Sequence, residues 1–152
     1  MYRIRADGTG LQKALDAPVL LVRDVSPDGK WLVAWAPLHG DGPPADQAFS
    51  LDGGPPVTIG PGGLQVRWSV DGRASFLHEN TFAAARTFAI PLSFEETLRR
   101  IPAGGFRSEE EIMGLPGARR IDAAEAVPGS SADIYAFYKG TTQRNLYRVP
   151  IP

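Results

Sequence analysis

One segment of this chain occurs twice, and it constrains the fold more than any other feature. Ser26–Trp35 reads SPDGKWLVAW, and Ser69–Leu77 reads SVDGRASFL and begins 43 residues later. Each copy places an Asp-Gly pair between two apolar runs, which is the sequence signal of a β-hairpin. A hairpin that recurs at an interval of roughly 40 residues predicts a repeat protein built from small antiparallel sheets.

The strands and turns around the two copies follow one order. Residues 19–60 and 61–92 each read as a long strand, an Asp-Gly turn, a strand, a loop and a further strand, and Pro56–Ile59 reads as a short edge strand. We expect the run Val19–Val25 to be an inner strand that is buried on both faces. Four strands in this order form an antiparallel meander, which is one blade of a β-propeller.

The whole chain is therefore predicted to be all-β, a partial β-propeller of about three four-stranded antiparallel meanders with one short helical insertion. Ser108 and Glu111 have the spacing of a capping box, which predicts a short helix that ends near Gly114. The expected parts are the end of a preceding blade at 1–18, blades at 19–60 and 61–92, an irregular or helical insertion at 93–122, and a last blade at 123–152.

The number of blades raises the question of what completes the ring. Closed propellers have roughly 4 to 8 blades, more than this sequence supplies. We expect the chain to be the C-terminal part of a larger propeller, or to pair with a second copy of itself as a homodimer. Edge strands favour such pairing because their N–H and C=O groups lack partners.

Composition and charge restrict the classes of partner. The chain has 152 residues and a formal net charge of −1, which gives no general attraction to nucleic acid or to an anionic membrane. Cysteine is absent, which excludes disulfides, zinc–thiolate sites and cysteine nucleophiles. We find no signal peptide after Met1 and no apolar run long enough to span a bilayer. We expect a soluble chain, periplasmic or cytoplasmic according to its parent protein.

The repeated residues resemble the TolB-like, WD-like propeller repeat, and the resemblance covers about two thirds of the chain. Tyr2–Trp35 matches it closely, and Phe49–Leu77 departs from it only at Val70, where proline is usual. Ala123–Pro152 matches loosely, because Pro128-Gly129-Ser130 replaces the Pro-Asp-Gly turn. The resemblance implies a scaffold that recognises partners through loops at one mouth of a propeller.

The C-terminal part is also similar to the end of propeller regions attached to bacterial serine/threonine protein kinases. The similarity lies in Gly105–Glu109, Leu115–Gly117 and Gln143–Arg148. The chain contains no Gly-rich loop with its lysine and no His-Arg-Asp or Asp-Phe-Gly sequence. Any kinase domain would lie outside this sequence.

The aromatic residues of the repeat strands favour packing between blades, because aromatic side chains bury large apolar areas. The alternative is an aromatic platform for a ligand, for which Trp31 is the best candidate. The residues concerned are Trp31, Trp35, Trp68 and Phe76.

Metal and catalytic chemistry find little support in the sequence. The Asp-Gly turns at Asp7, Asp28, Asp52 and Asp71 have the composition of ordinary turns, and calcium would need 6–8 oxygen ligands converging on one point. His39 and His78 are the only histidines, and Gly129-Ser130-Ser131 is not a nucleophile elbow. We predict no catalytic residue, no metal site and no cofactor.

The favoured function is a non-catalytic binding or scaffold module that recognises a protein or peptide partner. Binding residues concentrate on loops held by rigid sheets, so the candidate contact residues are His39, Asp41, His78, Glu79 and Asn80. Two alternatives to this function stay open. In the first, the chain is the substrate-gating propeller part of a prolyl oligopeptidase-type peptidase. In the second, it is the sensor region of a bacterial serine/threonine protein kinase.

Overall fold

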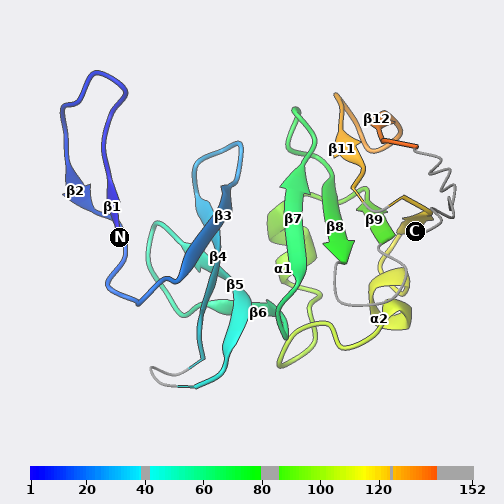
Figure 1. Ribbon diagram of the computed structural model, residues 1–152, viewed down its shortest axis with the longest axis horizontal. Coiled ribbons are helices and arrows are strands. Elements are labelled where there is room, and N and C mark those ends of the chain that lie inside the picture. The colour runs from blue at the N-terminus through cyan, green and yellow to red at the C-terminus, as the bar shows by residue number, and fades with distance from the viewer. Residues whose placement is uncertain (39–41, 80–85, 124, 140–152) are drawn as a thin grey trace, which may run out of the picture.

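The computed structural model describes residues 1–38, 42–79, 86–123 and 125–139, and its regular elements are mostly β-strands, with two short helices (Figure 1). The strands form four open antiparallel sheets of two or four strands. At this level the all-β prediction is confirmed. Among the described residues, no helix has both the length and the apolar character needed to cross a membrane.

The first four-stranded sheet, the first meander, joins its strands in chain order. Each strand is antiparallel to the next, and Asp-Gly turns connect the first strand to the second and the third to the fourth. Its strands are β3 (Leu21–Val25), β4 (Trp31–Pro37), β5 (Pro44–Ser50) and β6 (Val57–Gly60).

The second four-stranded sheet, the second meander, repeats this order with one difference. Its third strand continues into residues 91–118, which contain helices α1 (Phe94–Leu98) and α2 (Glu109–Met113), before the fourth strand completes the sheet. The fourth strand then pairs with the third, as Arg119 lies opposite Ala89. Its strands are β7 (Leu64–Trp68), β8 (Ser75–Glu79), β9 (Arg86–Ile90) and β10 (Arg119–Ile121).

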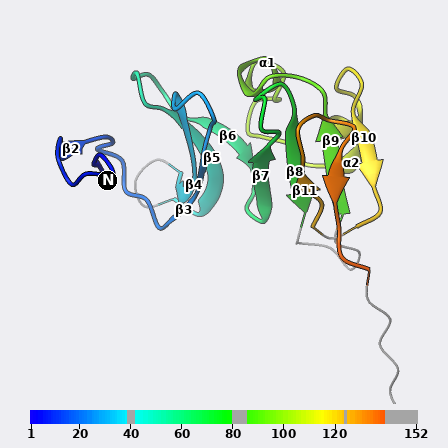
Figure 2. The ribbon, with the colours of Figure 1, turned by 90° about the horizontal axis from the view of Figure 1, so that it is seen from above.

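Two hairpins flank the meanders. The N-terminal hairpin pairs β1 (Tyr2–Arg3) with β2 (Gln12–Lys13), and the C-terminal hairpin pairs β11 (Val127–Pro128) with β12 (Tyr135–Ala136). Figure 2 shows the N-terminal hairpin, the first meander and the second meander following one another in chain order. β7 contacts β3 on one side and β11 on the other, so the first strands of three successive units lie beside one another.

The two helices begin and end at residues that the local sequence selects. At α1, Ser93 and Glu96 form a complete capping box, in which each side chain bonds the backbone of the other residue. At α2, the Ser108 side chain accepts a hydrogen bond from the Glu111 N–H, and Gly114 ends the helix. The short helix predicted from Ser108 to Gly114 is confirmed.

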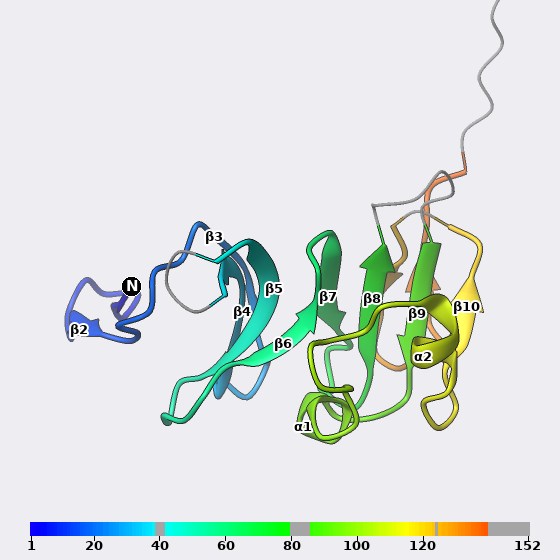
Figure 3. The ribbon, with the colours of Figure 1, turned by 90° about the horizontal axis from the view of Figure 1, so that it is seen from below.

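The main core lies between the two meanders. Apolar side chains from both sheets form one cluster, and both helices of residues 91–118 add side chains to it. Figure 3 shows the two helices beside the second meander. The Phe106 N–H donates to the Ile59 carbonyl at 2.8 Å, which covers the free edge of β6. The cluster includes Val33, Ala48 and Ile59 from the first meander, Val66, Leu77 and Phe88 from the second, and Phe94, Leu98, Phe106 and Ile112 from the connection.

Each meander also sends one polar side chain to the start of the unit that follows. Asp46 on β5 accepts a hydrogen bond from the Leu64 N–H at 3.0 Å, and Leu64 begins β7. Thr87 on β9 accepts one from the Ala126 N–H at 3.2 Å, directly before β11. Asp46 lies opposite Trp35 and Thr87 lies opposite His78, so the two residues hold matching places in their sheets.

One strand differs from its prediction. The run Val19–Val25 was expected to be buried on both faces, but β3 is at the edge of its sheet and its apolar side chains are largely exposed. The prediction is wrong because an apolar run shows that a strand can be buried without showing what covers it. The exposed residues are Leu20, Leu21, Val22 and Val25.

Candidate functional site

The first repeated turn is held by a compact set of hydrogen bonds. The Ser26 hydroxyl donates to Asp28 Oδ1 at 2.5 Å and accepts from the Trp31 N–H at 2.9 Å. Asp28 Oδ1 also accepts from the Lys30 N–H at 3.0 Å. Gly29 has a φ of 71°, a conformation that costs glycine little and other residues more. The Ser-x-Asp-Gly sequence therefore specifies this corner locally.

The second repeated turn has the same hydrogen bonds at the same positions. The Ser69 hydroxyl donates to Asp71 Oδ1 at 2.5 Å and accepts from the Ala74 N–H at 3.0 Å. Asp71 Oδ1 accepts from the Arg73 N–H at 3.0 Å. The replacement of proline by Val70 leaves this geometry intact, because the serine, aspartate and glycine make all of these contacts.

A pocket of about 400 Å³ lies between the two repeated turns and the start of α1. We call it the turn pocket. The turns approach each other closely, since a Cβ placed on Gly72 would lie 3.9 Å from the Cβ of Pro27. The lining residues are Ser26, Pro27, Asp28, Trp31, Trp68, Val70, Asp71, Gly72, Ser93, Phe94 and Glu95.

Three aromatic rings form one wall of the turn pocket. Phe94 meets Trp68 edge to face with ring centroids 5.2 Å apart, and it meets Trp31 in the same manner at 6.3 Å. Trp31 comes from the first meander and Trp68 from the second, so Phe94 joins the two sheets. The Trp68 Nε1–H is buried and has no hydrogen-bond acceptor among the described residues.

The turn pocket is acidic. Its lining contains the carboxylates of Asp28, Asp71 and Glu95, and no lysine, arginine or histidine among the described residues. The hydrogen bond from Ser26 lowers the pKa of Asp28, and the bond from Ser69 lowers the pKa of Asp71. Both aspartates are therefore ionised at neutral pH. Glu95 forms an ion pair with Arg99 along α1.

A second pocket of about 300 Å³ lies where the segment before α2 passes the start of β7. Leu64, Phe106 and Ile112 give it a mainly apolar lining, and Glu79 and Arg107 supply charge. Glu79 is half-buried at the end of β8. Of the five predicted contact residues, Glu79 therefore lies at a pocket.

The other predicted contact residues have different outcomes. His39, Asp41 and Asn80 lie outside the described residues. His78 was expected on a loop, but it lies within β8 and is 1% exposed. That expectation is wrong, because β8 extends through His78 and its ring faces the interior rather than solvent.

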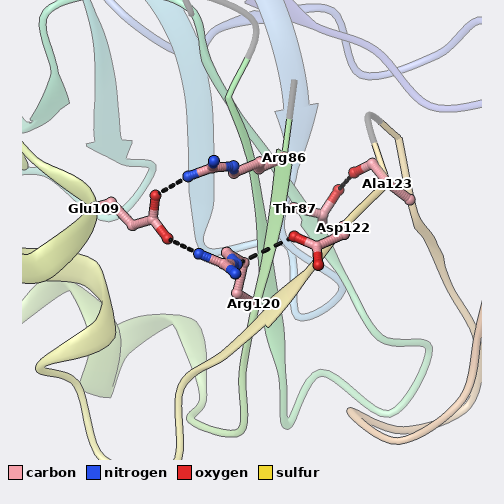
Figure 4. A network of polar contacts seen from close by, with 6 residues as sticks. All are labelled: Arg86, Thr87, Glu109, Arg120, Asp122 and Ala123. Carbon is pink, nitrogen blue, oxygen red and sulfur yellow. Dashed lines mark hydrogen bonds and ion pairs between the residues drawn. The ribbon is translucent and has the colours of Figure 1, made fainter. Parts of the chain in front are cut away.

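His78 belongs to a buried polar network. The Thr87 hydroxyl donates to the Ala123 carbonyl at 2.9 Å (Figure 4), lies 2.9 Å from His78 Nδ1 and accepts from the Ala126 N–H. A hydroxyl has one proton to donate, so all three contacts are satisfied together when His78 carries its proton on Nδ1. This arrangement ties β8 and β9 to the segment that follows β10.

A separate ion-pair network lies near this point (Figure 4). The Glu109 carboxylate pairs with Arg86 on β9 and, at 3.1 Å, with Arg120 on β10. Arg120 also pairs with Asp122 at 3.1 Å. These contacts fix the start of α2 against the edge of the second meander, so Glu109 has a positioning role.

The sequence predicted the two turns and singled out Trp31, but it did not predict that the start of α1 completes the turn pocket with Ser93, Phe94 and Glu95. The Ser93 and Glu96 spacing is a capping-box signal that would have placed the start of α1 correctly. No local signal places Phe94 against Trp31 and Trp68, because that contact depends on how two sheets pack. Trp35, expected in the packing between blades, lies on β4 but not in the turn pocket.

Comparison with known proteins supplies no family for this chain: no family model matches it, and neither the curated proteins nor the solved structures include a significant match. Among the described residues, no three His, Cys, Asp or Glu side chains gather where they could hold a metal ion.

Proposed function

We propose that the chain is a non-catalytic binding module, built from consecutive β-propeller blades, that recognises a protein or peptide partner. The observation that carries the proposal is the repeated link between units. Asp46 and Thr87 hold matching places in the two meanders, and each bonds the backbone at the start of the next unit. Units that contact their chain neighbours through one recurring bond are typical of repeat scaffolds.

The arrangement of first strands supports the same reading. β3, β7 and β11 lie beside one another, and each begins a new unit. In a propeller the first strands of successive blades gather around one axis, and partners bind at the ends of the blades. The turn pocket opens at such an end, between two neighbouring units.

The chemistry of the turn pocket favours binding over catalysis. The Ser26 hydroxyl donates to Asp28, and the Ser93 hydroxyl donates to Glu96 at 2.7 Å. Neither serine has a histidine or lysine beside it among the described lining residues. A serine nucleophile needs an adjacent base that can take its proton at neutral pH, and carboxylates with lowered pKa values serve poorly.

Selection from a displayed library of random peptides tests the proposal. The full chain is the bait, and the selected peptides are resynthesised and measured by calorimetry. We expect enrichment of a peptide class whose affinity falls at least tenfold in Val70→Trp. Val70 is largely exposed and lines the turn pocket, so a large ring at this position fills the pocket without disturbing the core.

The matched control is Leu11→Trp, which adds the same ring at another exposed apolar position, outside the turn pocket. This variant should bind the selected peptides as the unchanged chain does. The proposal is overturned if no peptide is enriched, or if both variants weaken binding equally.

A further inference from the structure

We propose that the turn pocket receives an arginine side chain of the partner polypeptide. This inference rests on the proposed function and names the chemistry that the partner presents. It is carried by two features that occur in the same place, an aromatic wall and a set of carboxylates.

The carboxylates come from both repeats. Asp28 belongs to the first turn and Asp71 to the second, and the pocket lies between them. In each aspartate, Oδ1 already accepts two hydrogen bonds within its own turn. A carboxylate can accept about four hydrogen bonds, so each aspartate keeps capacity for a cationic donor.

The aromatic wall favours an organic cation over a metal ion. Trp31 and Trp68 line the same space as the aspartates, and tryptophan binds cations over its ring face more strongly than other aromatics do. Guanidinium stacks on such faces and forms two parallel hydrogen bonds to a carboxylate, whereas an ammonium group acts as a compact point charge.

The pocket also suits the remainder of a peptide residue. Its volume of about 400 Å³ lies in the range of sites for small ligands.

Two basic side chains near the turn pocket limit its affinity for arginine. Lys30 and Arg73 follow the two aspartates and interact with them electrostatically, although neither side chain lines the pocket. They reduce the field on an incoming arginine without occupying the space. We therefore expect weak binding of an isolated arginine, on the order of 1 mM.

Fluorescence titration of the full chain tests the inference. The chain has three tryptophans, and Trp35→Phe leaves the two that line the turn pocket as the only indole reporters. The probes are Nα-acetyl-arginine amide and Nα-acetyl-citrulline amide, which have nearly the same shape and differ in charge. We expect the arginine derivative to bind at least tenfold more tightly.

Variants of the aspartates complete the test. Asp28→Asn and Asp71→Asn keep an oxygen that accepts the turn hydrogen bonds, so both variants should fold, and each should weaken arginine binding about tenfold. Asp52→Asn, in a turn that does not line the pocket, should leave binding unchanged.

Two outcomes would overturn the inference: equal binding of the two probes, or equal effects of Asp52→Asn and Asp28→Asn. The proposed function would survive either outcome as long as selected peptides still bind the full chain and lose affinity in Val70→Trp. Failure of the inference is therefore distinguishable from failure of the proposed function.

Discussion

The two meanders have the same strand order and the same corner geometry, yet their first strands have different surroundings. Leu21 begins β3 and is 48% exposed, whereas Leu64 begins β7 and is 6% exposed. Val22 and Val66, which hold the same register in their sheets, are 46% and 2% exposed. β7 lies between the first meander and β11, whereas β3 has contacts with β7 on one side. In such an array, burial is decided by neighbouring units as much as by the unit's own sequence.

The largest expected effect comes from shortening these two leucines in turn. Leu64→Ala removes a side chain from the main core and should lower the free energy of unfolding by roughly 2–5 kcal/mol. Leu21→Ala removes a half-exposed side chain and should cost less than about 1 kcal/mol. Urea denaturation followed by circular dichroism measures both values.

Equal losses in the two variants would contradict this comparison and would mean that β3 is covered in solution. A larger loss in Leu21→Ala at high protein concentration than at low concentration would identify a second copy as the cover.

The links between units allow a second comparison. Asp46→Ala leaves the Leu64 N–H without its acceptor and Arg23, which pairs with Asp46 at 3.2 Å, without its partner. We expect a loss of about 3 kcal/mol in the free energy of unfolding, since a group left unsatisfied in the interior is costly. Thr87→Val removes the acceptor of the Ala126 N–H together with the Thr87 contacts to His78 and Ala123. It leaves no charge unpaired, so it should cost less, about 1–2 kcal/mol.

The pH dependence of Asp46 sharpens that comparison. Burial raises the pKa of Asp46, although Arg23 and the Leu64 N–H oppose the shift. Because the folded pKa lies above the unfolded value, the stability that Asp46 contributes is fully present below 3.8 and falls as the pH rises through the folded pKa.

The control is Asp46→Asn, which keeps the acceptor for Leu64 and cannot ionise. Thermal melts from pH 3 upwards should show the stability of the unchanged chain falling relative to this variant. A difference that grows in the opposite direction would show that the pairing with Arg23 outweighs burial.

The smallest expected difference is between variants of the two corners. Ser69→Ala leaves the buried Ala74 N–H without its acceptor, whereas Ser26→Ala affects Trp31, which is half-buried. We expect a loss of about 1–2 kcal/mol for Ser69→Ala and a smaller one for Ser26→Ala. NMR titration should also show the pKa of Asp28 rising in Ser26→Ala, because the Ser26 hydrogen bond is the main cause of its lowering. An unchanged pKa would mean that the Lys30 N–H holds the carboxylate alone.

Local features of this fold could be predicted from the sequence. The Ser-x-Asp-Gly corners and the helix from Ser108 to Gly114 depend on hydrogen bonds between residues only a few positions apart. Such contacts are specified wherever the right residue types stand at the right spacing. The strands that flank these corners could be predicted for the same reason.

Features that depend on distant segments could not be read in this way. The exposure of β3, the burial of His78 and the contact of Phe94 with two tryptophans all result from how the sheets pack. Residues 91–118 separate β10 from β9, the third strand of its meander. The alternation of apolar and polar residues near β9 therefore does not predict β10. The candidate pocket was therefore predictable in its turns and in Trp31, but not as a single site.

The connection between β9 and β10 has a consequence for how this protein is made. Phe94 packs on Trp31, and Phe106 bonds the edge of β6 at Ile59, so the first meander is completed by residues that a ribosome adds much later. Synthesis proceeds at about 5–20 residues per second, which leaves this sheet without its cover for several seconds. A nascent chain that is paused before the connection should therefore expose an apolar face to chaperones.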